Sequence, residues 1–438
     1  MISVRYKAVA GVRGPLIFAK GIPRVKMGEI VKVHVREELR TAQVLEIAEE
    51  ITTLQVFEGT EGITRDTSVS FTGETLSMPT SAELLGRVLD GRGRPIDGRP
   101  AVSGELREIA GLPINPVMRE YPRHFVETGI SAIDGVLSLV RGQKLPIFTG
   151  GGLPHNELAS QIARQSSVLE EKEDFAVVFC AVGVTHEDAS LFLRELEDAR
   201  AAGRLVGFIN LAEDPTVERL TAARFALTAA EYLAFDESFH VLVILLDMTN
   251  YCEALREISA ARGEMPGRRA YPGYMYTDLA SIYERAGRIK GSRGSITQIP
   301  IVSMPDMDIT HPVPDLTGFI TEGQVVMSQS LFQRGIYPPI DVLPSLSRLM
   351  KDGVGENRTR GDHMDVADRL YSAYSKGRET RDLALVVGEG SLTSEERRYL
   401  RFADQFEKRF INQGRRERRG VQQTLDLGLE VLSVLEEE

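Results

Sequence analysis

Residues 141–165 contain a predicted strand, a glycine-rich turn and a helix in immediate succession, and no other segment restricts the fold as strongly. The segment reads RGQKLPIFTGGGLPHNELASQIARQ. Consecutive glycines permit a tight turn, and backbone N–H groups at the start of the helix can bind phosphate. This layout is typical of the P-loop in nucleotide-binding α/β domains. A strand-to-helix turn that binds no ligand would have the same pattern.

The turn lacks the side chains that carry the chemistry of a working P-loop, GxxxxGK[ST]. Pro154 stands at the second glycine and has no N–H to donate to a phosphate. His155 replaces the lysine, and it is shorter and mostly neutral at pH 7. Asn156 replaces the Ser or Thr whose hydroxyl holds magnesium. We therefore predict a degenerate phosphate loop that holds no metal and is formed by Gly150, Gly151, Gly152, Pro154, His155 and Asn156.

Strands and helices alternate around this turn. Strands are predicted at the apolar runs 145–149, 175–181, 205–211, 240–246 and 295–301. Helices at 156–168 and 251–262 are interspersed with them, so we expect an α/β fold with a doubly wound, mostly parallel sheet. Asp247 follows the strand 240–246, where a vestigial Walker B aspartate would stand. Alternatively, Asp247 caps the helix that follows it.

The regions on either side of this core have different patterns. Residues 1–72 contain short strands with glycine turns, including EIVKVHV at 29–35, and predict a small β-barrel. Residues 73–124 are rich in Gly and Pro and read as a connector that leads into the core domain, 73–344. Strands then stop, and residues 345–438 predict a helical domain. Its helices are expected at 363–376, 379–387, 395–412 and 421–435.

Composition narrows the class of partner. The net charge is −11, which argues against a nucleic-acid motor with a basic face. The late basic cluster Arg415, Arg416, Arg418 and Arg419 is interpreted as a solvated helix end. No apolar run approaches the ~20 residues needed to span a bilayer, so any membrane association is expected to come through partners. Cys180 and Cys252 are expected to be buried free thiols, as in a cytoplasmic protein.

Several long motifs are similar to one family. They are TGISAIDG at 128–135, VRGQKLPIF at 140–148, GLPHNELA at 152–159, AEYLAF at 230–235, DMTNYCEALREI at 247–258, PGRRAYPGYMYTDLASIYERAG at 266–287 and PPIDVLPSLS at 338–347. Together they resemble the B subunits of V- and A-type rotary ATPases and ATP synthases, over nearly the whole chain. The degenerate phosphate loop fits this resemblance, because it distinguishes the B subunits from the catalytic A subunits.

The resemblance implies a β-barrel, a RecA-like P-loop NTPase domain and a C-terminal helical domain. It also implies a ring in which this chain alternates with catalytic A subunits, together with central-shaft and peripheral-stalk subunits, at the cytoplasmic face of a membrane. Transport of H⁺ or Na⁺ would then be coupled to ATP hydrolysis or synthesis. ATP or ADP is expected at the interface with the catalytic subunit, with none bound tightly by this chain alone. Neither a nucleic-acid partner nor independent enzymatic activity is expected.

The resemblance also assigns roles to two positions. After the strand FAVVFCAVG, 175–183, the catalytic family members carry a glutamate that polarises the attacking water, whereas this chain has Val184, which cannot do so. Arg348 directly follows PSLS and is implied to be an arginine finger that acts in trans. A guanidinium is permanently charged and can donate two parallel hydrogen bonds to a γ-phosphate. Alternatives are a surface arginine near a helix start, or a finger at Arg358 or Arg360 instead.

Three other functions are also compatible with the amino-acid sequence. An independently active RecA-like ATPase would hydrolyse ATP as the purified chain. A ring motor on RNA would show tight, salt-dependent RNA binding. A purely structural ring subunit would leave the activity of its neighbours unchanged when Arg348 is replaced.

Overall fold

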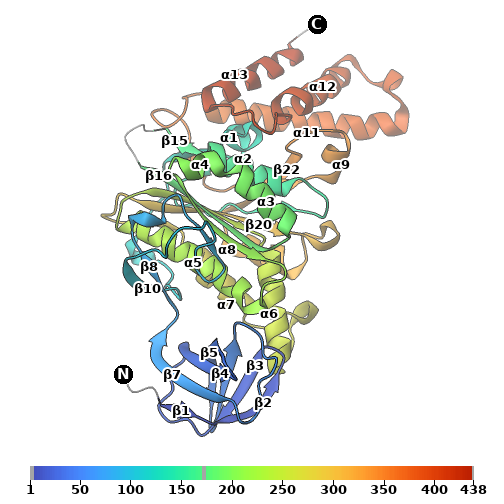
Figure 1. The fold of residues 1–438 in the computed structure, drawn as a ribbon. Coiled ribbons are helices and arrows are strands. Elements are labelled where there is room, and N and C mark those ends of the chain that lie inside the picture. Colours follow the sequence, from blue (N-terminus) through green and yellow to red (C-terminus); the bar gives the residue numbers. More distant parts are fainter. Residues whose placement is uncertain (1–3, 170–173, 437–438) are drawn as a thin grey trace.

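Three parts of the molecule lie one after another along its length: a β-barrel, a central sheet domain and a helical end (Figure 1). The computed structural model describes residues 4–169 and 174–436. The N-terminal barrel and the C-terminal helices lie at opposite ends, with the sheet domain between them. The predicted order of barrel, α/β core and helical domain is confirmed.

The barrel is a seven-stranded antiparallel sheet with the order β1-β7-β4-β5-β6-β3-β2. Its strands are β1 Arg5–Tyr6, β2 Val9–Arg13, β3 Leu16–Lys20, β4 Glu29–Val35, β5 Glu38–Ala48, β6 Ile51–Val56 and β7 Ser68–Thr75. The strands β1 and β2 are consecutive in the chain yet stand at the two ends of this order, so the sheet curves round on itself. Val31, Val33 and Val35 alternate into its apolar core, as the period-two pattern predicts.

The central sheet has the strand order β22-β21-β14-β20-β18-β16-β17-β9. All of these strands pair in parallel except β22, which is antiparallel to β21. The strands are β9 Val88–Asp90, β14 Ile147–Thr149, β16 Phe175–Val184, β17 Leu205–Leu211, β18 His240–Leu246, β20 Ser295–Ser303, β21 Gly323–Met327 and β22 Ile340–Ser347. The predicted mostly parallel sheet is therefore confirmed.

Helices cover both faces of this sheet, because successive residues of each buried strand point into different layers. On β16, Phe179 packs with one layer and Cys180 with the other. The first layer contains α1 Ser131–Val136, α2 His155–Gln165, α3 His186–Glu195 and α4 Glu197–Ala201. The second contains α5 Thr216–Phe235, α6 Met248–Arg262, α7 Met275–Tyr283 and α8 Pro312–Ile320. Cys180 and Cys252 are buried free thiols, as predicted.

Further short strands lie in the connector and in the loops of the central domain. They are β8 Ser77–Thr80, β10 Glu105–Glu108, β11 Arg119–Glu120, β12 Phe125–Glu127, β13 Leu139–Val140, β15 Ser167–Val168 and β19 Gly287–Ile289. The Gly- and Pro-rich connector supplies β9, which extends the central sheet beside β17. A bidentate ion pair closes the loop after β9: Asp97 accepts from Arg87 Nε at 2.7 Å and Nη2 at 3.1 Å.

The helical end contains α10 Met350–Gly353, α11 His363–Val387, α12 Ser394–Gln405 and α13 Val421–Leu432. The two helices expected at 363–376 and 379–387 are one continuous helix, α11. The helix expected at 395–412 divides into α12 and a π-helical turn at Phe406–Ile411. Gly377 lies where α11 and α12 meet, and a Cβ there would fall 2.6 Å from the Tyr399 carbonyl oxygen.

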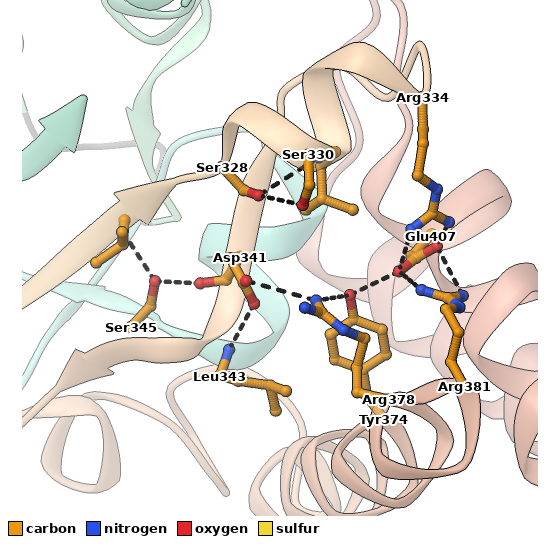
Figure 2. A network of polar contacts seen from close by, with 12 residues as sticks. Ser328, Ser330, Arg334, Asp341, Leu343, Ser345, Tyr374, Arg378, Arg381 and Glu407 are labelled. Carbon is orange, nitrogen blue, oxygen red and sulfur yellow. Dashed lines mark hydrogen bonds and ion pairs between the residues drawn. The ribbon is translucent and has the colours of Figure 1, made fainter. Parts of the chain in front are cut away.

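A buried carboxylate ties the helical end to the sheet domain (Figure 2). Glu407, in the π-helical turn, is fully buried and contacts Arg381, Tyr374 and Arg334. Arg334 follows α9 Gln329–Gln333 of the sheet domain, so this contact crosses the domain boundary. Beside it, Arg378 of α11 lies 3.5 Å from Asp341 of β22. Removing charge from this cluster would leave buried ions unpaired, which is costly.

The late arginine cluster does not lie at a helix end, contrary to the interpretation from sequence, although Arg415, Arg416 and Arg418 are exposed to solvent as expected. It lies in the loop between the π-helical turn and α13, where these three side chains pair across the domain boundary and the buried Arg419 pairs with Glu417 of the same loop. Arg415 pairs with Glu157 of α2, Arg416 with Glu195 of α3 and Arg418 with Glu127 of β12. These arginines therefore help to dock the helical end on the sheet domain.

The buried ion pair in the connector gives a pH-dependent prediction. Burial opposes ionisation of Asp97, but hydrogen bonds from Arg87, Val88 and Arg99 outweigh it and lower the Asp97 pKa to about 2. A carboxyl group whose pKa is lower in the folded state than in the unfolded state stabilises the fold at pH values above its unfolded-state pKa. That stabilisation is lost as the pH falls through the folded-state pKa. We expect Asp97→Asn to lower the free energy of unfolding by roughly 3 kcal/mol at pH 7. The difference from wild type should shrink by roughly 2 kcal/mol between pH 4 and pH 2.

Urea titrations at several pH values measure this difference. Asp236→Asn is the matched control, because Asp236 also forms a bidentate pair, with Arg107, but on the surface. That surface pair should contribute about 1 kcal/mol or less to the free energy of unfolding. Equal losses for the two variants, independent of pH, would contradict the prediction.

Candidate functional site

The predicted phosphate loop lies at the carboxyl end of β14, where ligands bind in open α/β sheets. Gly150 is buried. Gly151 and Gly152 are both exposed, and a Cβ at either position would meet no atom within 4 Å. Gly152 adopts a left-handed backbone, φ +77°, which glycine tolerates without strain. Pro154 is the N-cap of α2 and provides no side-chain cap. The strand, glycine-rich turn and helix that the sequence predicts at this segment are therefore present.

The side chains at the lysine and Ser/Thr positions make internal hydrogen bonds. The Nδ1 atom of His155 lies 2.9 Å from the Leu153 carbonyl oxygen and 3.4 Å from Thr149 Oγ1. Asn156 donates its amide N–H to Asp188 of α3 at 2.7 Å. These two side chains thus hold the turn and α3 together, and neither supplies a cation or a hydroxyl at the loop.

Met307 packs directly over the first glycine of the loop. A Cβ on Gly150 would fall 2.0 Å from the Met307 sulfur. Met307 and its neighbour Asp306 both have left-handed backbone conformations, with φ of +56° and +55°. No sequence motif marks Met307, which lies more than 150 residues from the loop in the chain. An apolar thioether here favours neither phosphate nor magnesium.

Asp247 follows β18 and caps α6, as the alternative interpretation of this residue proposed. Its Oδ1 atom accepts hydrogen bonds from the backbone N–H of Thr249 at 2.8 Å and of Ser303 at 3.2 Å. The carboxylate thus joins the carboxyl ends of β18 and β20. One of the two oxygens that a Walker B aspartate offers is used in this way.

The position of the water-polarising glutamate is also apolar in the structure. Val184 is buried in the first core layer. Gly183, before it, has φ +64° and donates its N–H to Asn210. Thr185, after it, caps α3 by accepting the Asp188 N–H at 3.1 Å. This end of β16 is therefore occupied by packing and capping interactions.

Arg348 lies at the other end of the sheet from the phosphate loop. It follows β22, and Ser347 pairs with Gly323 at the start of β21. Thr149, by contrast, ends β14, which is parallel to β21. About four residues of strand, or roughly 13 Å, separate the two levels. The chain thus presents its phosphate loop at the carboxyl end of the parallel strands and Arg348 at the amino end.

The guanidinium of Arg348 is exposed and lacks an acidic partner. Its Nη1 atom donates to the Thr321 carbonyl oxygen at 3.2 Å, and no carboxylate of the described residues lies within ion-pair distance. Arg360 differs, because it pairs with Asp362 at 2.6 Å and Asp426 at 2.5 Å. Arg358 is exposed and donates to a backbone carbonyl, that of Val354. Arg348 and Arg358 are therefore the candidates whose charge is not already neutralised.

Residues 4–169 and 174–436 contain neither a metal-ligand cluster nor a membrane-spanning helix. No group of three or more His, Cys, Asp or Glu side chains there could hold a metal ion. None of the helices in this described part combines the length and apolar character required to cross a membrane.

Three family models match the chain in the order of its domains. The β-barrel domain of the ATP synthase alpha/beta family matches residues 9–73, and the nucleotide-binding domain of that family matches 129–347. The C-terminal domain of V- and A-type ATP synthases matches 352–438.

Two relatives agree with these matches. The chain is 55% identical over 435 residues to the B subunit of the A-type ATP synthase of Thermofilum pendens, covering 99% of this chain and 95% of the relative. The solved structure of an ATP synthase subunit, NeqB, from Nanoarcheaum equitans superposes with a TM-score of 0.76 at 39% identity. That likeness covers 96% of this chain and 98% of the other. The chain belongs to the ATP synthase alpha/beta family and, within it, to the B subunits of the V- and A-type ATP synthases.

Proposed function

We propose that this chain is the non-catalytic ring subunit of a rotary ATPase or ATP synthase and that it supplies Arg348 in trans to a catalytic partner in the ring. The observation that carries the proposal is the placement of Arg348 at the amino end of the sheet, away from the chain's own phosphate loop. In a head-to-tail ring each subunit presents different surfaces to its two neighbours. Arg348 can thus serve one neighbour while the phosphate loop faces the other.

The chemistry of a guanidinium fits this role. Hydrolysis spreads negative charge over the equatorial oxygens of the γ-phosphate, and a fork of N–H donors stabilises that charge. Arg348 offers such a fork, because its guanidinium is exposed and its hydrogen bond to Thr321 leaves other N–H groups for a ligand. The same arrangement makes catalysis depend on how two subunits are seated, as a rotary machine requires.

The chain's own phosphate loop supports a non-catalytic assignment. The groups that would hold a triphosphate and magnesium are replaced by His155, Asn156 and Pro154, and Met307 covers Gly150. Residues 151 and 152 remain open, so weak adenine-nucleotide contacts at the interface with the catalytic A subunits are compatible with the loop. ATP or ADP would therefore be held mainly by the partner.

The wider assembly follows from the same proposal. Catalytic A subunits would alternate with this chain around a central shaft, with a peripheral stalk, at the cytoplasmic face of a membrane whose embedded sector moves H⁺ or Na⁺. A purely structural ring subunit is the second candidate, favoured by the internal hydrogen bonds of the phosphate loop. The two differ only in what Arg348 does.

The first prediction concerns nucleotide affinity. We expect the isolated chain to bind magnesium-ATP with a Kd weaker than about 1 µM, or about −8 kcal/mol, because His155 stands where a working P-loop has its lysine. The triple variant Pro154→Gly, His155→Lys and Asn156→Thr restores the P-loop side chains and should bind at least about tenfold more tightly. Calorimetry measures both. Sub-micromolar binding by the unmodified chain would contradict the prediction.

The second prediction concerns assembly. The chain should form a mixed ring with a partner that carries an intact GxxxxGK[ST] loop, since its two unlike surfaces need unlike neighbours. Native mass measurement of the mixed proteins should detect equal numbers of the two chains. A chain that stays monomeric beside that partner would count against the ring.

The third prediction concerns Arg348 in the assembled ring. We expect Arg348→Ala and Arg348→Lys to lower ATP turnover by ~10³ to 10⁵-fold, because a lysine ammonium lacks the planar fork. Assembly should be unaffected, since the side chain is exposed. Steady-state kinetics of the ring measures kcat.

Arg358→Ala is the matched control, because Arg358 is also an exposed arginine without an acidic partner among the described residues. Its turnover should stay close to that of the unmodified ring. Normal turnover in an assembled Arg348→Ala ring would overturn the role of Arg348. It would favour the purely structural role if Arg358→Ala is also normal, and a finger at Arg358 if that variant loses turnover.

A further inference from the structure

A fully buried glutamine just before β14 holds the residue that precedes Arg348. The Nε2 atom of Gln143 donates to Ser347 Oγ at 2.9 Å and to the Glu322 carbonyl oxygen at 3.1 Å. Its Oε1 atom accepts the Val140 N–H at 2.9 Å. Both N–H donors of the amide are thereby used. Because Gln143 is 0% exposed, moving it would leave buried polar groups without partners.

The next residue, Lys144, holds the adjacent turn. Its backbone N–H donates to Glu322 Oε2 at 2.8 Å, and its ammonium lies 2.9 Å from Glu322 Oε1. The same ammonium lies 2.9 Å from Glu284 Oε1. Lysine is almost never buried unless it is paired, and the Lys144 side chain is only 3% exposed. The Glu322 N–H also donates to the Lys144 carbonyl oxygen. The turn at residues 321–323 is therefore fixed by an ion pair, by one backbone–backbone hydrogen bond and by one hydrogen bond from the Lys144 N–H to the Glu322 carboxylate.

The contacts of Gln143 and of Lys144 meet at the residues that bind Arg348. Its backbone N–H donates to the Glu322 carbonyl oxygen at 3.0 Å, the same oxygen that Gln143 binds. Its Nη1 atom donates to the Thr321 carbonyl oxygen, one residue earlier in the turn. An exposed arginine has many rotamers to lose on binding. Here both its backbone and one side of its guanidinium are attached to a turn that buried side chains hold in place.

We propose that Gln143 and Lys144 are positioning residues for Arg348, which hold its guanidinium at a set place and angle toward the neighbouring subunit. This inference rests on the proposed role of Arg348 in trans. The physical reason is that hydrogen-bond catalysis depends on geometry, and a displacement of about 1 Å can cost about 100-fold in rate. Neither residue touches the reacting atoms, so each acts through Ser347 and the 321–323 turn.

Two serines on one strand provide a matched test. Each hydroxyl accepts one N–H and donates to one carbonyl: Ser347 with Gln143 and Ser138, and Ser345 with Val326 and Asp341. Figure 2 shows Ser345 beside Asp341, near the start of β22. Ser347→Ala removes the contact next to Arg348, whereas Ser345→Ala removes an equivalent contact elsewhere on the strand.

In rings assembled with the catalytic partner, we expect Ser347→Ala to lower kcat for ATP by about 10- to 100-fold with little change in KM. Ser345→Ala should leave kcat near that of the unmodified ring. In the Arg348→Ala background, adding Ser347→Ala should cause no further loss, because there is no guanidinium left to position. Native mass measurement confirms that each ring is complete.

Two carboxylates that share Lys144 give a second pair of variants, for use if a serine variant does not assemble. The side chains of Glu322 and Glu284 are 31% and 34% exposed, so both tolerate a change to glutamine. Each change removes one ion pair with the ammonium, but only Glu322 belongs to the turn that binds Arg348. Glu322→Gln should therefore lower kcat more than Glu284→Gln does.

The outcomes separate this inference from the proposed function. Equal kcat for the two members of a pair, or an additive loss in the Arg348→Ala background, would overturn the positioning role while a collapse in Arg348→Ala still supports the finger. Normal turnover of Arg348→Ala would overturn the finger itself, and the positioning role with it.

Discussion

Parallel pairing of β14 with β20 and β21 determines where every part of the candidate site lies. Because parallel strands share their polarity, the turn after β14 lies at the carboxyl end of the sheet. Pairing of β22 antiparallel to β21 then carries the chain back to the amino end, where Arg348 follows. One antiparallel edge strand is thus enough to separate the phosphate loop from the arginine, and a ring subunit needs that separation to contact two unlike neighbours.

The side chains that stand at the lysine and hydroxyl positions of the phosphate loop form internal contacts. Where a P-loop lysine and hydroxyl would await a ligand, His155 and Asn156 bond to Leu153 and Asp188. A buried polar group without a partner destabilises the fold, and these contacts supply partners for both side chains. The glycines permit the turn, and His155 and Asn156 help to hold it together.

Sequence patterns predicted the sheet better than the helical end. The strands at 205–211 and 240–246 match the structure at both ends, because each is a buried and mostly apolar run. The predicted break in α11 was wrong, since Gly377 serves the close approach of α12 and does not end the helix. The arginine cluster was misread for a related reason: its carboxylate partners Glu127, Glu157 and Glu195 lie more than 200 residues away in the chain.

Prediction of the candidate site from sequence was limited in the same way, because contacts between distant residues leave no local pattern. Gly150 and Arg348 were identified because local motifs mark them. Met307 lies in no such motif, and the motif that contains Gln143 does not reveal its contact with the distant Ser347. Burying an amide and an ammonium costs free energy unless all their polar atoms are paired. Gln143 and Lys144 meet that condition by binding Ser347 and Glu322, which flank an exposed arginine in space. An arginine that served only solubility would gain nothing from such fixed geometry, whereas the role in trans proposed for Arg348 would require it.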